Sequence, residues 1–243
     1  MLGHGGGNVL GDPRVRMTRP TEFTFTFSHS APEDKKLKED LRKDTHYIFD
    51  NMSWRKIIDK DSTSVDDLRD IVSDRWSRPR NPFDEVFPGI FLGDASAALC
   101  MSILVREGIG FVVNAADSCS RCLAGRNCGT CVRTRQAFYN VGNIQLKAIA
   151  ALDEVGFPLY WYFNEATEFI DNALATGGKV LVHCREGISR SATLVIAYLM
   201  MKKGMTAKEA VRLVRNKRQI YPNDGFLLQL CDLDLRLRGQ RKY

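Results

Sequence analysis

A cysteine and an arginine six residues apart mark the stretch of this sequence with the clearest chemistry. Cys184 follows the apolar run KVLVH, and Arg190 stands just before a helix-like segment that begins at Ser191. A strand, a loop and a helix N-terminus in this order form an anion site, because the backbone N–H groups of residues 185–190 can converge on one tetrahedral anion at the positive end of the helix. The spacing therefore predicts a phosphate-binding loop with a cysteine at its base.

Each residue type in this loop suits one part of nucleophilic chemistry. The field of the helix stabilises a thiolate over a thiol, which would make Cys184 a nucleophile near neutral pH. Arg190 can bind two phosphate oxygens in a bidentate fork, and Gly187 lets the backbone curl where a side chain would obstruct it. Ser191 can donate a hydrogen bond to the sulfur, while His183 suits a structural role better than proton transfer. The alternative is a buried core cysteine at a strand end.

The elements that must position this loop alternate between strand-like and helix-like patterns. This alternation favours an α/β fold with a mainly parallel sheet. Ser64 is expected to cap the first helix, with Asp67 three residues later. The expected strands are Gly89–Asp94, Gly110–Ala116, Tyr139–Lys147 and Lys179–His183, and the expected helices are Ser64–Val72, Ala95–Gly108, Pro158–Ala175, Ser191–Lys203, Thr206–Lys217 and Asp224–Arg236.

The amino-acid composition limits the classes of protein to which this chain can belong. The 243 residues are 44% hydrophobic and 26% charged, which suits a globular protein with one domain plus an extension or with two small domains. The pattern along the chain favours an N-terminal extension at 1–62 and a folded domain at 63–243. We expect the extension to be partly disordered, because it offers little apolar surface. No apolar run is long enough for a membrane span, and the N-terminus has no signal-peptide core. We therefore expect a cytoplasmic protein, with the nucleus as a second location, and in such a reducing compartment the seven cysteines indicate catalysis, metal binding or burial before disulfides.

The motif HCREGISRS matches the loop His-Cys-five residues-Arg-Ser/Thr, and the sequence resembles the small atypical dual-specificity protein phosphatases. The resemblance covers nearly all of Val65–Leu237, including FPGIFLGDASAA, NAADS and RQIYPNDGFLLQL. It implies a mostly parallel five-stranded mixed sheet flanked by helices. It also implies hydrolysis of phosphate monoesters through a phosphocysteine at Cys184, with no cofactor required.

The same chemistry needs an acid to protonate the leaving oxygen and a base to activate water. In the family an aspartate does both, on a loop before the helix that precedes the catalytic strand. Here that loop is AALDEVGFPL, and Asp153 is the expected acid, with Glu154 as the second candidate. A solvated acidic turn is the structural alternative.

The composition of the loop narrows the substrate class. Its residues Arg185, Glu186, Gly187, Ile188 and Ser189 are the expected substrate-binding set. Lysines typical of phosphoinositide phosphatases are lacking, and no insert for phosphotyrosine recognition stands out, so the resemblance implies phosphotyrosine and phosphoserine or phosphothreonine in proteins. Arg218 matches a position where related enzymes place a basic residue near the cleft, which gives two alternatives: it binds a second phosphate, or it is a solvated surface residue.

A second group of cysteines, in CSRCLAGRNCGTC, repeats the CxxC spacing that is typical of zinc ligands. Nothing in the resemblance supports this cluster, which leaves three alternatives: a structural zinc knuckle, a loop of reduced thiols, or redox capture of oxidised Cys184. The candidate ligands are Cys119, Cys122, Cys128 and Cys131.

The net charge of +6 indicates an anionic partner. Phosphoprotein substrates fit the loop best, and a kinase that docks on the extension is a second kind of partner. A phosphoprotein-binding scaffold without catalysis and a nucleic-acid binder built on the cysteine knuckle are the competing functions. A membrane partner is not expected, nucleic acid is the weaker alternative, and the sequence leaves the oligomeric state open.

Overall fold

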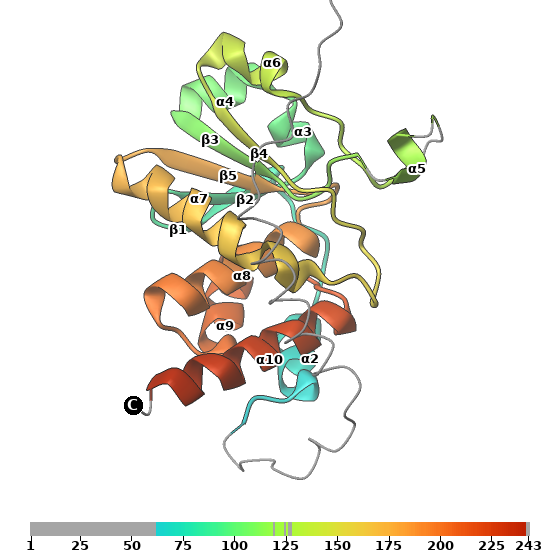
Figure 1. Ribbon diagram of the computed structural model, residues 1–243, viewed down its shortest axis with the longest axis vertical. Coiled ribbons are helices and arrows are strands. Elements are labelled where there is room, and N and C mark those ends of the chain that lie inside the picture. Colours follow the sequence, from blue (N-terminus) through green and yellow to red (C-terminus); the bar gives the residue numbers. More distant parts are fainter. Residues whose placement is uncertain (1–61, 119, 124, 126–127, 242–243) are drawn as a thin grey trace, which may run out of the picture. The chain divides into compact units, whose positions relative to one another are not determined.

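A computed structural model describes residues 62–118, 120–123, 125 and 128–241 of the chain (Figure 1). The predicted N-terminal extension, 1–62, therefore lies outside the described residues apart from Ser62. No helix in the described ranges has the length and apolar character that a bilayer crossing needs.

The domain is built on a five-stranded sheet with the order β1-β2-β5-β3-β4. The strands are β1 (Phe83–Phe87), β2 (Ile90–Gly93), β3 (Ile109–Asn114), β4 (Gln145–Ala148) and β5 (Lys179–His183). β1 pairs antiparallel with β2, and every other pair is parallel. The prediction of an α/β fold with a mostly parallel mixed sheet is confirmed.

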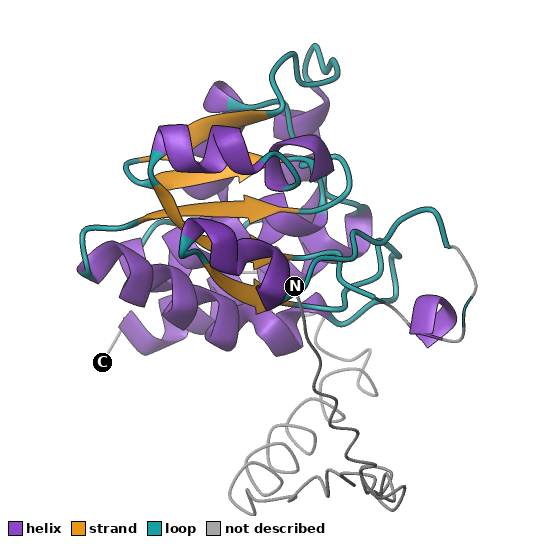
Figure 2. Ribbon diagram, turned by 90° about the horizontal axis from the view of Figure 1, so that it is seen from above, coloured by secondary structure: helices purple, strands orange, loops and turns teal. Residues whose placement is uncertain are grey.

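Helices cover both faces of the sheet, which explains why its central strand is apolar on both sides (Figures 1 and 2). Val180 and Val182 of β5 belong to the larger core under α7 and α8, whereas Leu181 belongs to the smaller core on the opposite face. Strands that are buried on both faces read as continuous apolar runs rather than as alternating ones. The helices are α2 (Val65–Ser73), α3 (Ala95–Ala98), α4 (Met101–Glu107), α5 (Ser120–Leu123), α6 (Gln136–Tyr139), α7 (Phe163–Ala175), α8 (Arg190–Lys203), α9 (Ala207–Lys217) and α10 (Asp224–Arg241), and 3-10 turns lie at Asn140–Gly142 and Leu159–Tyr162.

Local signals set several helix boundaries. Ser64 and Asp67 form the predicted capping box at the start of α2, and Thr206 with Glu209 forms another at the start of α9. Gly108 adopts the left-handed conformation that ends α4. These caps satisfy backbone groups that the helices themselves leave unpaired.

Several elements differ from the prediction, among them the helix expected over Pro158–Ala175, whose first part, Leu159–Tyr162, is a 3-10 helix. The helix expected over Ala95–Gly108 is two helices, because Cys100 leaves the helical conformation with ψ 88°. The strand expected over Tyr139–Lys147 is confined to β4, and Tyr139 instead closes α6. β1 was not predicted, since it is an edge strand whose sequence FDEVF carries two acids and has only Val86 buried.

The register of the parallel strands decides where the loops meet. His183 at the end of β5 pairs with Gly93 at the end of β2 and with Asn114 at the end of β3. The loops after β2, β3, β4 and β5 therefore leave the sheet at the same edge, where α/β proteins place their ligand sites. This edge brings the cysteine loop (117–135, after β3), the acid loop (149–158, after β4) and the phosphate loop (184–190, after β5) together.

Candidate active site

Cys184 lies at the base of the phosphate loop, with its side chain buried. Its Sγ accepts hydrogen bonds from the Ser191 hydroxyl at 3.1 Å and from the Gly187 backbone N–H at 3.3 Å. Burial would raise the pKa of the Cys184 thiol, but the charge of Arg190 and the hydrogen bonds from Ser191 and Gly187 outweigh it, and the pKa is lowered from 9.0. The arrangement thus favours the thiolate, which is the nucleophilic form.

Gly187 makes the curl of the phosphate loop sterically feasible. Its φ is +69°, and a Cβ at this position would clash with the carbonyl group of Gly93 and lie 2.9 Å from Nη2 of Arg218. The loop therefore needs glycine here for two reasons, the left-handed backbone and the close approach of β2.

Arg190 opens α8 and is 2% exposed. Its Nη1 donates to the carbonyl oxygens of Ala151 at 3.1 Å and Thr130 at 3.3 Å, and its Nη2 donates to Thr130 at 3.2 Å. These three bonds use the Nη1 side of the guanidinium and leave Nε–H and one Nη2–H, which form one bidentate edge. The carbonyls hold the arginine so that this edge can bind two oxygens of a phosphate.

His183 supports the loop from the strand end. Its Nδ1 lies 3.3 Å from the carbonyl oxygen of Cys184 and donates to it, while Nε2 has no hydrogen-bond partner among the described residues. Burial lowers the pKa of His183 to about 4, so the imidazole is neutral near pH 7. This contact agrees with the structural role expected from the sequence.

The acid loop brings Asp153 to the phosphate loop. Its Oδ1 accepts hydrogen bonds from the Ser189 hydroxyl at 2.7 Å and from Nδ2 of Asn223 at 2.9 Å, and its Oδ2 lies 3.4 Å from Nε of Arg190. Asp153 and Glu154 are both exposed residues, but the Glu154 side chain makes no hydrogen bond or ion pair with any described residue. Of the two carboxylates proposed from the sequence, the structure therefore brings Asp153 to Arg190.

Sequence reasoning missed Asn223 as part of this site. The amide binds Asp153 through Nδ2, while its Oδ1 accepts from the backbone N–H of Phe226 in the first turn of α10. An asparagine before an Asp-Gly helix start could have been read as a cap. Its contact with a carboxylate 70 residues earlier in the chain has no local signal.

Of the two alternatives predicted for Arg218, the solvated surface residue is wrong, because the side chain is buried, whereas binding of a second phosphate stays a prediction. The Arg218 side chain is 1% exposed and pairs with Asp84 at 2.8 Å. It also donates to the backbone carbonyl oxygens of Gly187 at 3.0 Å, Asn81 at 2.9 Å and Glu186 at 3.4 Å. Through these contacts the Nε, Nη1 and Nη2 atoms of the guanidinium hold the phosphate loop against β1.

The remaining residues of the phosphate loop differ in exposure. Arg185 and Glu186 are exposed, Ile188 is half-buried, and Ser189 is buried beside Asp153. Backbone contacts hold both sides of the loop, because the Arg185 carbonyl accepts from Ala95 and the Ile188 carbonyl accepts from Tyr221. Among the expected substrate-binding residues, the exposed side chains are those nearest the cysteine in sequence.

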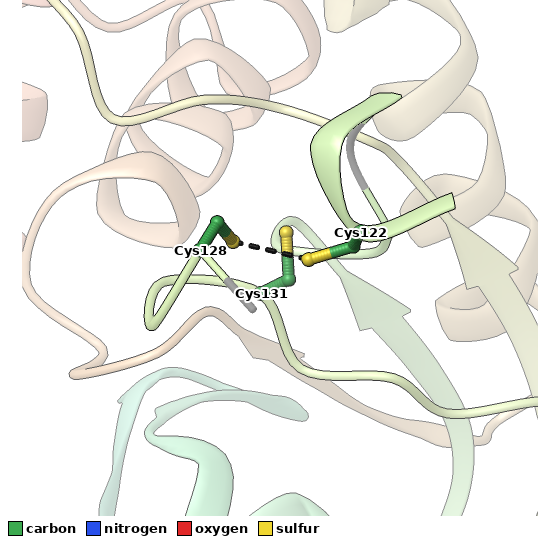
Figure 3. A group of neighbouring side chains, drawn as sticks. All are labelled: Cys122, Cys128 and Cys131. Carbon is green, nitrogen blue, oxygen red and sulfur yellow. Dashed lines mark hydrogen bonds between the residues drawn. The ribbon is translucent and has the colours of Figure 1, made fainter. Parts of the chain in front are cut away.

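The cysteine loop gathers three thiols (Figure 3). The Sγ atoms of Cys122, Cys128 and Cys131 all lie within 4.8 Å of one another, and those of Cys122 and Cys128 are 3.2 Å apart. Hydrogen bonds from Thr130 and from the neighbouring cysteines lower the pKa of Cys128 to about 5. Cys119, the fourth predicted ligand, lies outside the described residues.

Comparison with known proteins places this arrangement in a family. The sequence model of the dual specificity phosphatase catalytic domain matches residues 90–235, more than half of the chain. The chain belongs to the dual-specificity protein phosphatases. It is 46% identical over 164 residues to human dual specificity protein phosphatase 13B, a match covering 67% of this chain and 78% of that protein. It is 43% identical over 159 residues to human dual specificity protein phosphatase 26, covering 65% and 70%.

Solved structures of this family have the same fold. Human DUSP28 superimposes with a TM-score of 0.56 at 28% identity, covering 67% of this chain and 99% of that one. The human tyrosine phosphatase-like serine/threonine/tyrosine-interacting protein superimposes with a TM-score of 0.51 at 31% identity, covering 63% and 96%. This phosphatase of the dual-specificity family thus carries Cys184, Arg190 and Asp153 together at the carboxyl edge of its sheet.

Proposed function

We propose that this phosphatase hydrolyses phosphate monoesters on proteins through a phosphocysteine intermediate at Cys184. One observation carries the proposal: a buried thiol with a lowered pKa lies at the start of a loop whose last residue, Arg190, keeps a bidentate edge facing Asp153. A nucleophile, an anion-binding fork and a proton carrier are the three groups that this reaction needs.

In the first step the Cys184 thiolate attacks phosphorus, the bond from phosphorus to the substrate oxygen breaks, and Asp153 gives its proton to the leaving oxygen. Arg190 and the loop N–H groups bind the other phosphate oxygens, where charge accumulates in the transition state. Ser189 and Asn223, which both donate to Asp153, fix the direction of that carboxyl group.

In the second step a water attacks the phosphocysteine, and Asp153 takes the proton of that water. The phosphorus–sulfur bond breaks, and the electron pair returns to Cys184 as a thiolate. Ser191 is placed for this step, because its hydroxyl donates to Sγ at 3.1 Å and stabilises the negative sulfur as it leaves.

The substrate class follows from the composition of the loop and from the family. We propose that phosphotyrosine, phosphoserine and phosphothreonine are all accepted, with Ile188 as an apolar wall beside the substrate. A docked kinase would be a partner of the N-terminal extension. The six cysteines of the described residues are free thiols, which supports a reducing compartment, the cytoplasm or nucleus, as the site of action.

Two pairs of matched variants test the mechanism. Phosphate release from a small aryl phosphate and from phosphotyrosine and phosphothreonine peptides should be lost in Cys184→Ser and unchanged in Cys100→Ser, which removes a thiol outside the site. Asp153→Asn should slow turnover about 10²–10⁴-fold, the usual range for general acid–base catalysis, while Glu154→Gln should have little effect. Activity that survives Cys184→Ser would rule out the phosphocysteine, and phosphopeptide binding without turnover by the unmodified chain would favour a scaffold.

A further inference from the structure

The arrangement of the three thiols in the cysteine loop fits a metal ion better than it fits chance proximity. Four thiolates around Zn²⁺ at about 2.3 Å place neighbouring sulfurs about 3.8 Å apart. The sulfurs of Cys122, Cys128 and Cys131 all lie within 4.8 Å of one another, those of Cys122 and Cys128 are 3.2 Å apart, and Figure 3 shows the side chains turned toward one another. A disulfide needs about 2.05 Å, and all three are free thiols.

The C-terminal side of this cluster is already fixed to the sheet. Asn114, buried at the end of β3, donates from Nδ2 to the Val132 carbonyl at 2.7 Å and to the Thr134 hydroxyl at 2.9 Å. The Val132 N–H donates to the Ala116 carbonyl at 2.6 Å. The segment that directly follows Cys131 is therefore held against the end of β3.

The N-terminal side stands away from the sheet. The short helix α5, which contains Cys122, protrudes from the domain in both views (Figures 1 and 2). Its link to the rest of the loop includes a hydrogen bond from Arg133 to the Cys122 carbonyl. A metal bound by all three thiols would join this protruding part to the fixed part.

The cluster also reaches the active site through one backbone carbonyl. Thr130 lies between Cys128 and Cys131, and its carbonyl oxygen accepts from both Nη1 and Nη2 of Arg190, at 3.3 Å and 3.2 Å. The carbonyls of Thr130 and Ala151 together hold the guanidinium so that its Nε edge is directed at Asp153. The position of Thr130 thus depends on the two cysteines that flank it.

We propose that Cys122, Cys128 and Cys131 bind Zn²⁺ as thiolates, and that the bound metal positions the Thr130 carbonyl that orients Arg190. The metal is structural and takes no part in the phosphate chemistry. The first half of the proposal stands independently of the proposed function, whereas the second half rests on Arg190 being the phosphate-binding residue. Cys119 is the fourth cysteine of the sequence motif, and the site does not rest on it, since it lies outside the described residues.

Metal content tests the first half. The full chain, purified without chelator, should hold close to one equivalent of zinc, and so should Cys100→Ser, the matched control outside the cluster. Cys128→Ser and Cys131→Ser should hold less than about a tenth of an equivalent, because structural zinc sites depend on their full ligand set. As a measurement that needs no variant, Co²⁺ added to metal-free wild type should give the absorption of thiolate-bound tetrahedral cobalt.

Binding of inorganic phosphate tests the second half without relying on turnover. Calorimetry should show that phosphate binds about tenfold more weakly to zinc-free wild type than to the zinc-loaded chain, as expected when a charged hydrogen bond loses its fixed partner. Adding chelator should not change the phosphate affinity of Cys128→Ser, because this variant already lacks the metal.

The outcomes separate the two halves. A wild type with less than about a tenth of an equivalent of zinc and no cobalt–thiolate absorption overturns the metal site, as does a Cys122–Cys128 disulfide in freshly purified protein. Stoichiometric zinc with unchanged phosphate affinity after its removal overturns the link to Arg190. If phosphate binds neither form, the proposed function fails together with that link, while the zinc content still decides the metal site.

Discussion

Two loops at the same edge of the sheet carry cysteines, and their environments differ in almost every respect. In the phosphate loop Cys184 is buried, and its partners Gly187 and Ser191 are three and seven residues away. In the cysteine loop, by contrast, Cys128 and Cys131 are only partly buried although Cys122 is buried, and the three sulfurs lie within 4.8 Å of one another. A single thiol surrounded by donors suits nucleophilic chemistry, whereas several thiols that face one another suit metal binding.

The two loops also contact each other, and this contact shows how a non-catalytic loop can affect a catalytic one. Arg190 takes one carbonyl from Thr130 of the cysteine loop and one from Ala151 of the acid loop. An arginine at the start of a helix has five donors to satisfy. The donors that point away from Asp153 are satisfied by carbonyls of neighbouring loops, which thereby fix the orientation of the guanidinium.

The largest difference between the loops should appear when their glycines are replaced. Gly187 and Gly129 both have φ +69°, but a Cβ on Gly187 would clash with the backbone of Gly93, and a Cβ on Gly129 would meet nothing within 4 Å. Gly187→Ala should lower the free energy of unfolding by about 2–5 kcal/mol, from backbone strain plus overpacking. Gly129→Ala should cost about 1–2 kcal/mol, from strain alone. Urea unfolding of both variants measures the gap, and equal losses would contradict the role of the Gly93 contact.

The second difference is that the free energy of unfolding should depend on pH through His183, which lies at the base of the phosphate loop. Its pKa is about 4 in the folded chain, against 6.5 ordinarily, so below pH 6.5 the unfolded chain binds a proton that the folded chain does not. The free energy of unfolding should therefore fall as the pH falls from 6.5 to about 4, by about 3 kcal/mol in total. Urea unfolding at several pH values measures this slope.

His183→Gln supplies the control for that slope. The other three histidines of the chain precede Ser62, so their contribution is the same in both proteins. Subtracting the curve of the variant leaves the contribution of His183. A difference that does not change between pH 4 and 6.5 would show that burial does not depress this pKa.

The smallest expected effect concerns the reactivity of the thiols. Ser191→Ala removes one of the hydrogen bonds that lower the pKa of Cys184, so the pH of half-maximal alkylation of Cys184 should rise by about one unit. Alkylation rates resolved by peptide mass spectrometry measure this, and Cys184→Ser identifies the signal. Cys131, in the other loop, should alkylate as in wild type; a common shift of both cysteines would point to a general loss of structure instead.

Local signals account for what the sequence predicted correctly. The capping box of Ser64 and Asp67, the apolar run of β5 and the spacing from Cys184 to Arg190 all involve residues within one element or one loop. The mixed sheet and the family followed from a resemblance carried by such local motifs. Edge strand β1 escaped prediction because its charged sequence has only one buried side chain, and side-chain burial is the main signal for a strand.

The sequence alone determined the chemistry that is contained in one loop: a cysteine beneath a helix N-terminus, a glycine that permits the curl and an arginine for the anion. Only the tertiary structure decided which carboxylate, amide and carbonyls surround that loop. Asp153, Asn223 and Thr130 reach it from separate segments. The same packing buried Arg218 against Asp84, which excludes the solvated surface position that the sequence allowed. The physical reason is that parallel strands bring loops distant in sequence to one edge, and the side-chain contacts made there depend on packing rather than on spacing along the chain.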